Sequence, residues 1–350
     1  MSRSLPNTIF VTGGAGFIGS CFTGLCAGKG ARVIVLDKLT YAGHKANLEW
    51  IGKGKYELVE GDIADSKLLH ALLKKHTPDA VLNFAAESHV DNSISGPAPF
   101  IETNITGTFR LLEESLKYWK AQPKAQQDAF RFIQVSTDEV YGSLGPKGAF
   151  TETTPLQPNS PYSVSKAAGD HLAHAWHHTY GLPTLITRCS NNYGPRQFPE
   201  KLIPHMIQCA LSGQKLPVYG DGGNVRDWIH VEDHCAGLWL ALTKGKPGEV
   251  YNFGGHAETD NLSLVKQLCA LLDKRRPRLD GKSYAEHISF VTDRPGHDRR
   301  YAIDDAKAEK ELGFSRTYTD FAEGLAATVD WYLANEAWRQ TVLNRKRSAA

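Results

Sequence analysis

The chain has 350 residues, 41% of them hydrophobic, so it is long enough to bury a sizeable core and to form a nucleotide-binding unit with a second, smaller lobe. Its formal net charge of +2 is close to neutral, which argues against nucleic acid as a partner. No stretch approaches the ~18 consecutive apolar residues of a membrane span, and residues 1–4 lead into the first predicted strand without an apolar signal segment. Six cysteines without a Cys-x-x-Cys pair favour reduced thiols, so a cytoplasmic protein with no membrane partner is expected.

A glycine-rich turn follows the first predicted strand (residues 8–11) and precedes a helix predicted from Ser20 to Lys29. Gly13, Gly16 and Gly19 permit a tight turn, close approach of the backbone to a pyrophosphate, and close packing of helix on strand. The second predicted strand, residues 32–36, ends at Asp37, whose carboxylate can accept hydrogen bonds from an adenosine ribose and would repel a 2′-phosphate. The pattern predicts NAD rather than NADP, although the neighbouring Lys38 weakens that preference. The alternative is a glycine-rich turn of another α/β protein.

Strand-like runs recur at residues 56–60, 80–84, 130–136 and 184–189, with helical segments between them. This alternation predicts an α/β protein with a Rossmann-like, doubly wound parallel sheet covered by helices on both faces. After residue 190 prolines and glycines interrupt the pattern, which indicates a smaller, interleaved C-terminal lobe. We expect residues 1–190 to form the NAD-binding domain, with residues 226–252 returning to it. Residues 191–225 and 253–350 should form mainly the second lobe.

Two adjacent acids follow the strand at residues 130–136, in the run Thr137-Asp138-Glu139. The carboxyl ends of strands in an open α/β sheet face the ligand crevice, so these side chains are candidates to act on one substrate. An elimination needs one group that protonates a leaving hydroxyl and another that removes a proton from the neighbouring carbon. By itself the run is also compatible with a solvated turn after a strand.

Tyr162 and Lys166 are spaced i and i+4, which places both side chains on one face of a helix predicted to start near residues 159–161. A tyrosine acts as a base near neutral pH only when positive charge lowers its pKa. Lys166 and an oxidised nicotinamide could supply that charge together. The same spacing also occurs on ordinary helix surfaces, so this pair gains weight from the predicted dinucleotide site.

Taken together, these elements resemble the extended short-chain dehydrogenase/reductase family and, within it, the nucleotide-sugar 4,6-dehydratases. The glycine-rich turn and the Tyr-x-x-x-Lys pair are shared with epimerases and reductases, whereas the Thr-Asp-Glu run separates dehydratases from them. The resemblance covers nearly the whole chain. It rests on residues 13–19, 37–43, 61–63, 83–91, 136–142, 162–166, 191–195, 198–204, 226–231 and 293–298.

The resemblance implies a tightly bound NAD that is regenerated in each turnover, and a dTDP-sugar as substrate. The catalytic residues it implies are Thr137, Asp138, Glu139, Tyr162 and Lys166. The cofactor-binding residues it implies are Gly13, Gly16, Phe17, Ile18, Gly19, Asp37, Lys38, Thr40, Asp62, Ile63, Ala85, Ala86, Ser88, Tyr162 and Lys166. The substrate-binding residues it implies are Ser88, Thr137, Asn191, Glu200, Lys201, Leu202, Pro217, Tyr219, Arg226, Asn261, Arg294 and His297.

The reaction that the resemblance implies converts dTDP-glucose to dTDP-4-keto-6-deoxyglucose. Tyr162 would serve the oxidation at C4, and Glu139 and Asp138 the loss of water across C5 and C6, before hydride returns to C6. Alternatives are a 4,6-dehydratase for UDP- or other nucleotide sugars, a 4-epimerase or decarboxylase on the same scaffold, and a catalytically silent NAD-sensing regulator. An epimerase has no use for the adjacent acids, and a regulator would be expected to have lost Tyr162 or Lys166.

Two helical stripes and one histidine pair complete the sequence-based expectations. Apolar residues repeat at helical intervals over residues 101–116 and 164–175, and in the resembling family these helices pair with their copies in a four-helix bundle, which implies a homodimer. His174 and His178 have the i, i+4 spacing of metal ligands but lack a His-Glu-x-x-His frame, so no metal is expected. Asn92 stands where the family commonly has arginine, which leaves the substrate preference open.

Overall fold

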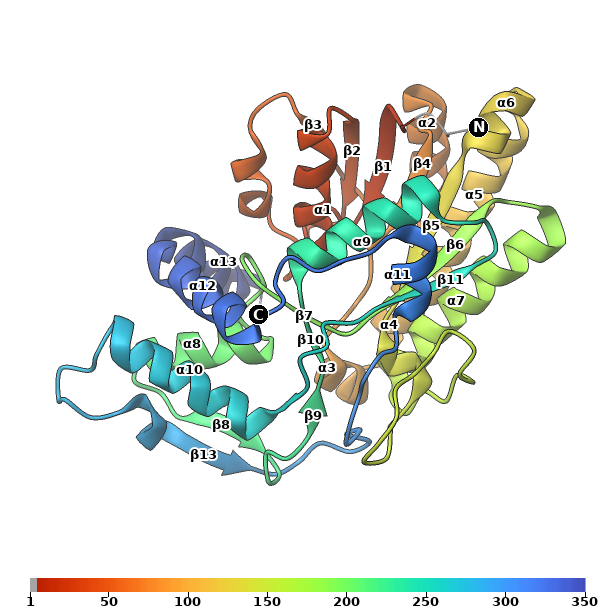
Figure 1. Cartoon of the computed structure of the whole chain (residues 1–350). Coiled ribbons are helices and arrows are strands. Elements are labelled where there is room, and N and C mark those ends of the chain that lie inside the picture. Colours follow the sequence, from red (N-terminus) through yellow and green to blue (C-terminus); the bar gives the residue numbers. More distant parts are fainter. Residues whose placement is uncertain (1–4, 350) are drawn as a thin grey trace.

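The computed structural model describes residues 5–349, so the expectation for residues 1–4 lies outside the described chain. Within the described residues a seven-stranded sheet forms the centre of the larger domain, in the order β11-β6-β5-β4-β1-β2-β3 (Figure 1). Every neighbouring pair in this sheet is parallel, which confirms the predicted Rossmann-like fold. The strands are β1 (Thr8–Thr12), β2 (Arg32–Asp37), β3 (Tyr56–Glu60), β4 (Ala80–Asn83), β5 (Arg131–Val135), β6 (Thr184–Cys189) and β11 (Val250–Phe253).

Helices cover both faces of this sheet because alternate strand residues point to opposite sides. Val33 and Val35 of β2 pack into a core with α1 (Phe17–Gly28), α9 (Val231–Lys244) and α11 (Ala306–Leu312). Ile34 and Leu36 of the same strand pack into the opposite core. That second core contains residues of α2 (Ser66–His76), α5 (Thr108–Lys120) and α7 (Pro161–Tyr180). The α5 helix continues α4 (Ala98–Phe100) and η3 (Ile101–Gly107), and the short helices α3 (Val90–Ser95) and α6 (Lys124–Ala129) flank this segment.

The smaller lobe, in the lower left of Figure 1, has its own apolar core. It is built from α8 (Leu202–Leu211), α10 (Asn261–Arg275), α12 (Phe321–Ala334), α13 (Glu336–Ala349) and the parallel pair β8 (Leu216–Tyr219) and β13 (Ile288–Val291). The two-residue strands β9 (Val225–Arg226) and β12 (Thr259–Asp260) and the helix η5 (Tyr284–His287) complete it. The pair β7 (Asn191–Tyr193) and β10 (Trp228–His230) lies between the lobes in the picture. Among the described residues, no helix is long and apolar enough to cross a bilayer.

Helix starts follow local capping chemistry. Ser160 caps α7 through a reciprocal capping box with Ser163, Pro161 occupies the first helical position, and Gly181 ends the helix in the left-handed region. The predicted start near residues 159–161 is therefore confirmed. Helix α1, in contrast, begins at Phe17 rather than at Ser20, because the glycine-rich turn closes earlier and the chain enters the helix directly after Gly16.

A chain of buried polar side chains crosses the middle of the sheet. The Thr12 hydroxyl donates to Asn83 Oδ1 over 2.7 Å, and Asn83 Nδ2 donates to Gln134 Oε1 over 2.9 Å. Thr12 pairs with Asn83 and Asn83 with Gln134 in the strand register, so three polar groups occupy neighbouring positions on β1, β4 and β5. Asn83 Nδ2 also donates to the Thr108 hydroxyl over 3.1 Å, which joins the sheet to α5.

Candidate active site

A cavity of about 340 Å³ opens at the carboxyl ends of the central strands, where the smaller lobe approaches the sheet. This is the position at which open α/β sheets bind ligands. All of the residues predicted to bind a cofactor line it, as do all five predicted catalytic residues. Of the predicted substrate-binding residues, Ser88, Thr137, Asn191, Glu200, Lys201 and Leu202 line the same cavity.

The glycine-rich turn is shaped for close approach of a ligand to the backbone. Gly13 has a φ of 65°, and a Cβ at that position would lie 2.6 Å from the amide nitrogen of Ala85. A Cβ at Gly19 would lie 2.3 Å from the carbonyl oxygen of Gly13. Larger residues are therefore excluded by backbone atoms rather than by movable side chains. Phe17, Ile18 and Gly19, in the first turn of α1, line the cavity. The N–H groups of a first helical turn have no partner within the helix, which suits a pyrophosphate and thus fits a dinucleotide.

Asp37 is fixed at the end of β2 by two backbone hydrogen bonds. Its Oδ2 accepts from the amide of Ala15 over 2.8 Å, and its Oδ1 accepts from the amide of Leu39 over 2.7 Å. The neighbouring Lys38 forms an ion pair with Asp62, with 2.7 Å between Nζ and Oδ2. Burial acts to raise the pKa of Asp62, but the bond from Lys38 brings it below its ordinary value. The Lys38 charge is thus engaged by a protein carboxylate, which reduces its attraction for a 2′-phosphate.

The two adjacent acids lie on a short helical turn, η4 (Asp138–Tyr141), directly after β5. Thr137 caps this turn: the Glu139 amide donates to its hydroxyl over 3.3 Å, and the hydroxyl lies 3.2 Å from Asp138 Oδ1, to which it can donate. Asp138 is buried, and among the described residues its Oδ2 has no hydrogen-bond partner. Burial, then the charges of Glu139 and Asp227, raise the pKa of Asp138 well above its ordinary value. Asp138 therefore favours the protonated form that a general acid requires.

Glu139 has a different electrostatic environment from its neighbour. Burial raises its pKa, but the positive charges of Arg294, Arg226 and Lys201 act in the opposite direction. Two carboxyls that are adjacent in the sequence thus differ in their tendency to ionise. That separation is the arrangement that lets one acid donate a proton while the other accepts one.

Tyr162 and Lys166 extend from the first turns of α7 into the cavity. Lys166 Nζ donates to the carbonyl oxygen of Val135 over 2.7 Å, which fixes the ammonium group beneath the end of β5. Burial and then the charge of Glu139 raise the pKa of Tyr162 well above its ordinary value, whereas burial lowers the pKa of Lys166. Protein groups alone therefore do not prepare Tyr162 as a base. The positive charge of an oxidised nicotinamide would lower the pKa of Tyr162 and so oppose the effect of burial on it.

The remaining predicted substrate-binding residues lie outside the cavity lining. Arg294 donates to Asp91 Oδ1 over 2.8 Å, and the Tyr219 hydroxyl donates to Asp91 Oδ2, also over 2.8 Å. His297 packs edge-on against Tyr219, with ring centroids 6.2 Å apart. Asp91 was not among the predicted site residues, because its only sequence signal was its place in the run of residues 83–91. The others are Pro217 on β8, Asn261 at the start of α10, and Arg226, which is buried and donates to the carbonyl oxygen of Asp298 over 3.0 Å.

Comparison with known proteins agrees with this geometry. A family model for GDP-mannose 4,6 dehydratase matches residues 10–328. The chain is 59% identical to dTDP-glucose 4,6-dehydratase of Xanthomonas campestris pv. campestris (strain B100) over 338 residues, which cover 96% of both chains. The chain belongs to the nucleotide-sugar 4,6-dehydratase family. Its identity to dTDP-glucose 4,6-dehydratase of Salmonella typhimurium is 51%, over 95% of each chain.

Solved structures place this dehydratase on a scaffold that epimerases also use. The crystal structure of DesIV, a dTDP-glucose 4,6-dehydratase from Streptomyces venezuelae with NAD and TYD bound, has a TM-score of 0.87 and 46% identity. The match covers 96% of this chain and 99% of that one. A UDP-glucose 4-epimerase from Thermotoga maritima, with UDP-glucose, has a TM-score of 0.82 and 31% identity, over 94% and 99% of the two chains. The fold alone therefore does not distinguish the two reactions.

A buried network that sequence reasoning missed joins the two segments that carry the predicted catalytic residues. Arg188 Nε donates to Asp170 Oδ2 over 2.9 Å, and Arg188 Nη1 donates to the Tyr141 hydroxyl over 2.9 Å. That hydroxyl donates in turn to Asn252 Oδ1 over 2.9 Å. Asp170 is on α7 with Tyr162, while Tyr141 is the last residue of the turn that carries the acids. The available signal was the spacing of Asp170, one helical turn after the lysine.

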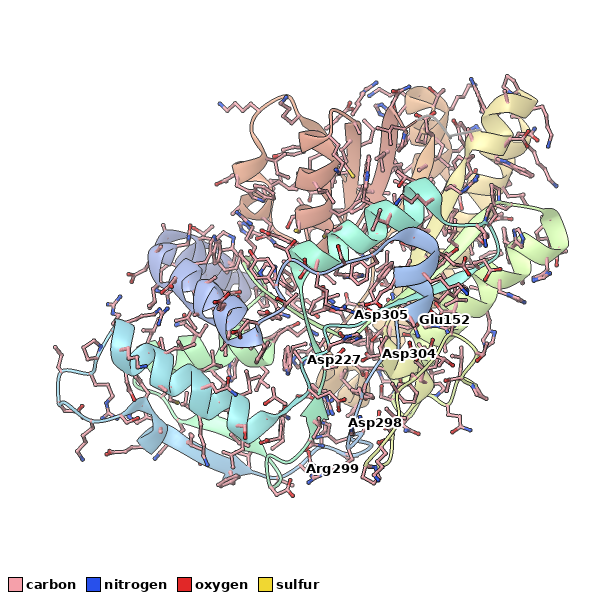
Figure 2. All side chains as sticks on the ribbon, viewed as in Figure 1. Glu152, Asp227, Asp298, Arg299, Asp304 and Asp305 are labelled. Carbon is pink, nitrogen blue, oxygen red and sulfur yellow. The ribbon has the colours of Figure 1, made fainter. Side chains whose placement is uncertain are left out.

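Acids near the end of β11 support the backbone (Figure 2). Asp227 accepts from the amides of Gly255 and Ala257 over 2.8 and 2.7 Å. Asp305 accepts from the amide of Gly254 over 2.9 Å, and Glu152 accepts from the amide of Asn252 over 3.0 Å. These carboxylates thus satisfy backbone donors within β11 and directly after it. Asp227 in addition contributes the negative charge that disfavours ionisation of Asp138.

One group of residues has the composition of a metal site. His256, Asp305 and Glu309 bring their ligand atoms within 4.8 Å of one another. Arg316 bonds to all three: its Nη1 donates to Glu309 over 3.1 Å, its Nη2 lies 3.1 Å from His256 Nε2, and it also pairs with Asp305. An arginine thus occupies the centre of the group and supplies the positive charge. The rings of His174 and His178 lie 4.3 Å apart on α7, outside the residues that line the cavity.

Proposed function

We infer that this protein is an NAD-dependent dTDP-glucose 4,6-dehydratase, a hydro-lyase that forms dTDP-4-keto-6-deoxyglucose for deoxysugar synthesis. The observation that carries the inference is the pair Asp138 and Glu139, held on one capped turn in different electrostatic environments beside Tyr162. The nearly full-length identity to dTDP-glucose 4,6-dehydratases supports the same reaction. A 4-epimerase shares the scaffold but has no step that needs two such acids.

The residues of the glycine-rich turn would hold NAD⁺, which would supply a hydride acceptor for C4 of the sugar and a hydride donor for C6. Tyr162 takes the proton of the C4 hydroxyl, and Thr137 donates a hydrogen bond to the same oxygen. Lys166, anchored on the carbonyl of Val135, stabilises the tyrosinate and holds the nicotinamide ribose. The role of these three residues is thus to make C4 a ketone, which acidifies the C5 proton.

Loss of water follows on the other side of the sugar. Glu139 removes the C5 proton: burial raises its pKa, but the charges of Arg294, Arg226 and Lys201 oppose that effect, so it ionises more readily than Asp138. Asp138, kept protonated by burial and by its acidic neighbours, donates its proton to the C6 hydroxyl, which leaves as water. Glu139 then gives its proton back to C5. A bound cofactor that returns its hydride to C6 would be oxidised again at the end of each turnover and would not need to leave.

We assign the remaining predicted site residues to two groups. The residues from the glycine-rich turn to Ser88 hold the dinucleotide, with Asp37 at the adenosine ribose in favour of NAD. The dTDP moiety lies toward the second lobe, where Arg226 and Arg294 offer forked donors to phosphate oxygens and Tyr219 packs on the base or ribose. Lys201, whose Nζ lies 2.6 Å from the carbonyl oxygen of Ser88, stands between the two groups. The proposed division into residues 1–190 with 226–252, and mainly 191–225 with 253–350, follows the same split, except that α11 packs against the sheet domain.

We also propose a homodimer and a cytoplasmic location. Ile101 is 41% exposed and Val164 is 46% exposed, although both lie on apolar stripes of neighbouring helices, η3 and α7. Pairing these helices with their copies would form a four-helix bundle and cover both stripes. All six cysteines are free thiols, five of them buried, which suits a reducing compartment.

The test is incubation of the purified protein with dTDP-glucose, and in parallel with UDP-, CDP- and GDP-sugars. We expect mass spectrometry to show loss of one water from dTDP-glucose and formation of the 4-keto product, with no net accumulation of NADH. One NADH left behind for each product molecule would refute the internal return of hydride. Faster conversion of another nucleotide sugar would support the dehydratase chemistry but identify that sugar as the substrate. One base methyl, which distinguishes thymine from uracil, changes the binding free energy by only ~1–3 kcal/mol.

A further inference from the structure

Three aromatic residues cluster where α12 ends and α13 begins. The ring of Trp331 lies with its centroid 5.1 Å from that of Tyr332 and 5.1 Å from that of Trp338, and the last two are 6.1 Å apart. None of the three lines the cavity. We call Trp331, Tyr332 and Trp338 the aromatic clasp. In Figure 1 their helices lie on the side of the smaller lobe that faces the sheet domain.

The clasp reaches the glycine-rich turn through one buried amide. Trp338 Nε1 donates to Asn47 Oδ1 over 2.9 Å, and Asn47 Nδ2 donates to the carbonyl oxygen of Ala15 over 2.8 Å. Asn47, the last residue of η1 (Lys45–Asn47), is only 2% exposed, so water cannot readily replace a lost partner. Ala15 belongs to the turn between β1 and α1. Two hydrogen bonds therefore connect the C-terminal helices to the wall that holds the pyrophosphate.

The clasp also reaches a second wall of the cavity, the segment 194–201. The Tyr332 hydroxyl donates to the carbonyl oxygen of Gln197 over 2.6 Å, and both Gln197 and Phe198 line the cavity. The ring of Phe198 meets that of Tyr41 edge-on, with centroids 5.8 Å apart. Since Thr40 and Ala42 line the cavity on either side of Tyr41, segment 194–201 touches the cofactor side of the cavity directly.

Arg196 connects the clasp to the sheet domain by stacking. Its guanidinium carbon lies 4.3 Å from the ring centroid of Trp50, in η2 (Glu49–Ile51), and 5.3 Å from that of Trp331. Trp50 in turn packs on α1, where a Cβ on Gly24 would lie 2.2 Å from its ring. The backbone of Arg196 has a φ of 70°, a conformation that persists only where the surroundings favour it. A continuous stack therefore runs from α1 to α12.

We propose that Trp338 and Tyr332 are positioning residues of the cofactor site, which retain NAD by tying both walls of the cavity to the same pair of C-terminal helices. A dinucleotide leaves when one wall moves away from the other, and the clasp opposes that movement on both sides. The inference rests on the proposed function only in taking NAD as the occupant. It goes beyond that function by assigning cofactor retention to residues that do not touch the cavity.

The test compares two conservative variants with a matched control. Trp338→Phe removes the bond to Asn47, and Tyr332→Phe removes the bond to Gln197, while both keep an aromatic ring in place. Trp119→Phe removes an equivalent bond, from Nε1 to the carbonyl oxygen of Gln127 over 2.9 Å, at the end of α5 away from the cavity. NAD per chain is measured by chromatography after denaturation, and the rate of NAD loss is followed during dialysis.

We expect NAD to dissociate about 3- to 10-fold faster from each clasp variant, the factor that one neutral hydrogen bond typically contributes, and faster still from the double variant. Activity lost on dialysis should return with excess NAD⁺. The Trp119→Phe protein should retain NAD like the unaltered chain. Equal retention by all the variants would overturn the proposal.

A measurement on the unaltered protein covers the case in which a variant fails to fold. NAD binding should increase the protection of amides in α13 and in segment 194–201 from hydrogen exchange. Unchanged protection in both places would overturn the proposal. These readouts need no turnover, so a protein that binds NAD but fails to dehydrate dTDP-glucose would refute the proposed function and leave the clasp intact.

Discussion

The glycine-rich end of the cavity and the end that faces the smaller lobe differ in how their residues are held. At the first end, turns directly after the strands supply the lining, and backbone groups fix the carboxylate of Asp37. Beside the second end, outside the residues that line the cavity, side chains meet across long sequence distances, as in the pair Arg294–Asp91, which are 203 positions apart. Backbone anchoring suits a cofactor that stays, while exchangeable side-chain pairs suit a substrate that enters and leaves in each turnover.

Tyr162 is the residue assigned to the first chemical step, so its substitution should reduce the rate of the reaction most. Tyr162→Phe removes the proposed base for C4 oxidation, and the rate should fall by something like 10²–10⁴-fold. Single-turnover absorbance should show hardly any NADH with dTDP-glucose. NADH formation at the normal rate would mean that another group takes the C4 proton.

Substitution of the acids should separate the two chemical steps. Glu139→Gln and Asp138→Asn leave Tyr162, Thr137 and Lys166 in place, so NADH should appear and persist while loss of water slows by roughly 10²-fold or more. The Glu139→Gln protein should also fail to exchange the C5 hydrogen with deuterated solvent. Normal turnover and exchange in that variant would refute the paired-carboxylate mechanism.

At the side-chain end, Arg294→Gln should weaken substrate binding. It removes a forked donor and leaves Asp91 without its ion pair, so KM for dTDP-glucose should rise roughly 10-fold or more, the scale of a charged hydrogen bond. It also removes positive charge that opposes the effect of burial on Glu139. The pKa of Glu139 should then rise, and the acidic limb of the pH–rate profile, where this base is protonated, should move to higher pH.

Arg299→Gln is the matched control for that substitution. It breaks a comparable ion pair, Arg299–Asp221 at 2.9 Å, between two side chains that are largely exposed. Because exposed pairs contribute little, KM and the pH profile should stay close to those of the unaltered protein. Equal effects of the two substitutions would mean that Arg294 has no special relation to the site.

A smaller effect is expected from Tyr141→Phe, which breaks the network between α7 and the turn that carries the acids. The ring keeps its stack on Phe150, but the bonds to Arg188 and Asn252 are lost. We expect loss of water to slow about 3- to 10-fold relative to C4 oxidation. Tyr118→Phe, which loses a bond to the carbonyl of Pro78, should leave that ratio unchanged.

The smallest effect concerns stability and pH. Because the folded-state pKa of Asp138 is raised, the folded protein binds this proton more tightly than the unfolded chain. The contribution of this proton to the free energy of unfolding is therefore fully present below the pKa that Asp138 has in the unfolded chain. It declines as the pH rises toward the pKa that Asp138 has in the folded protein. Asp138→Asn removes this dependence, so the gain in Tm over the unaltered protein should be larger at pH 8 than at pH 5 in calorimetry. A gain that is the same at both pH values would contradict the protonation assigned to Asp138.

The parts that sequence reasoning could reach are those with local physical causes. Strand and helix boundaries follow from periodicity and from caps such as Ser160, and the glycine-rich turn is specified by residues within one short segment. The same reasoning placed the acids after β5 and the tyrosine on the first turn of α7. Because parallel strands end at one edge of a sheet, these separate motifs converge in one cavity.

What the sequence did not reveal depends on contacts between distant segments. Asp91 binds Arg294 and Tyr219, and Asn47 binds Trp338, but no pattern within either segment indicates its partner. The start of α1 at Phe17 was missed because it depends on where the preceding turn closes. The direction of the pKa shift of Tyr162 likewise depends on burial and on the charge of Glu139, and only the folded structure specifies both.

The polar chain Thr12–Asn83–Gln134 has a consequence for how this chain finds its fold. Parallel strands made of valine, isoleucine and leucine can slide past one another with little change in apolar contact. A slip by one residue on β1, β4 or β5 would instead leave a hydroxyl or an amide facing an apolar side chain inside the sheet, at a cost of about 1–3 kcal/mol for each unsatisfied group. These three side chains therefore help to specify the register of β1, β4 and β5. A variant with apolar residues at all three positions should lose this preference and form sheets with shifted register.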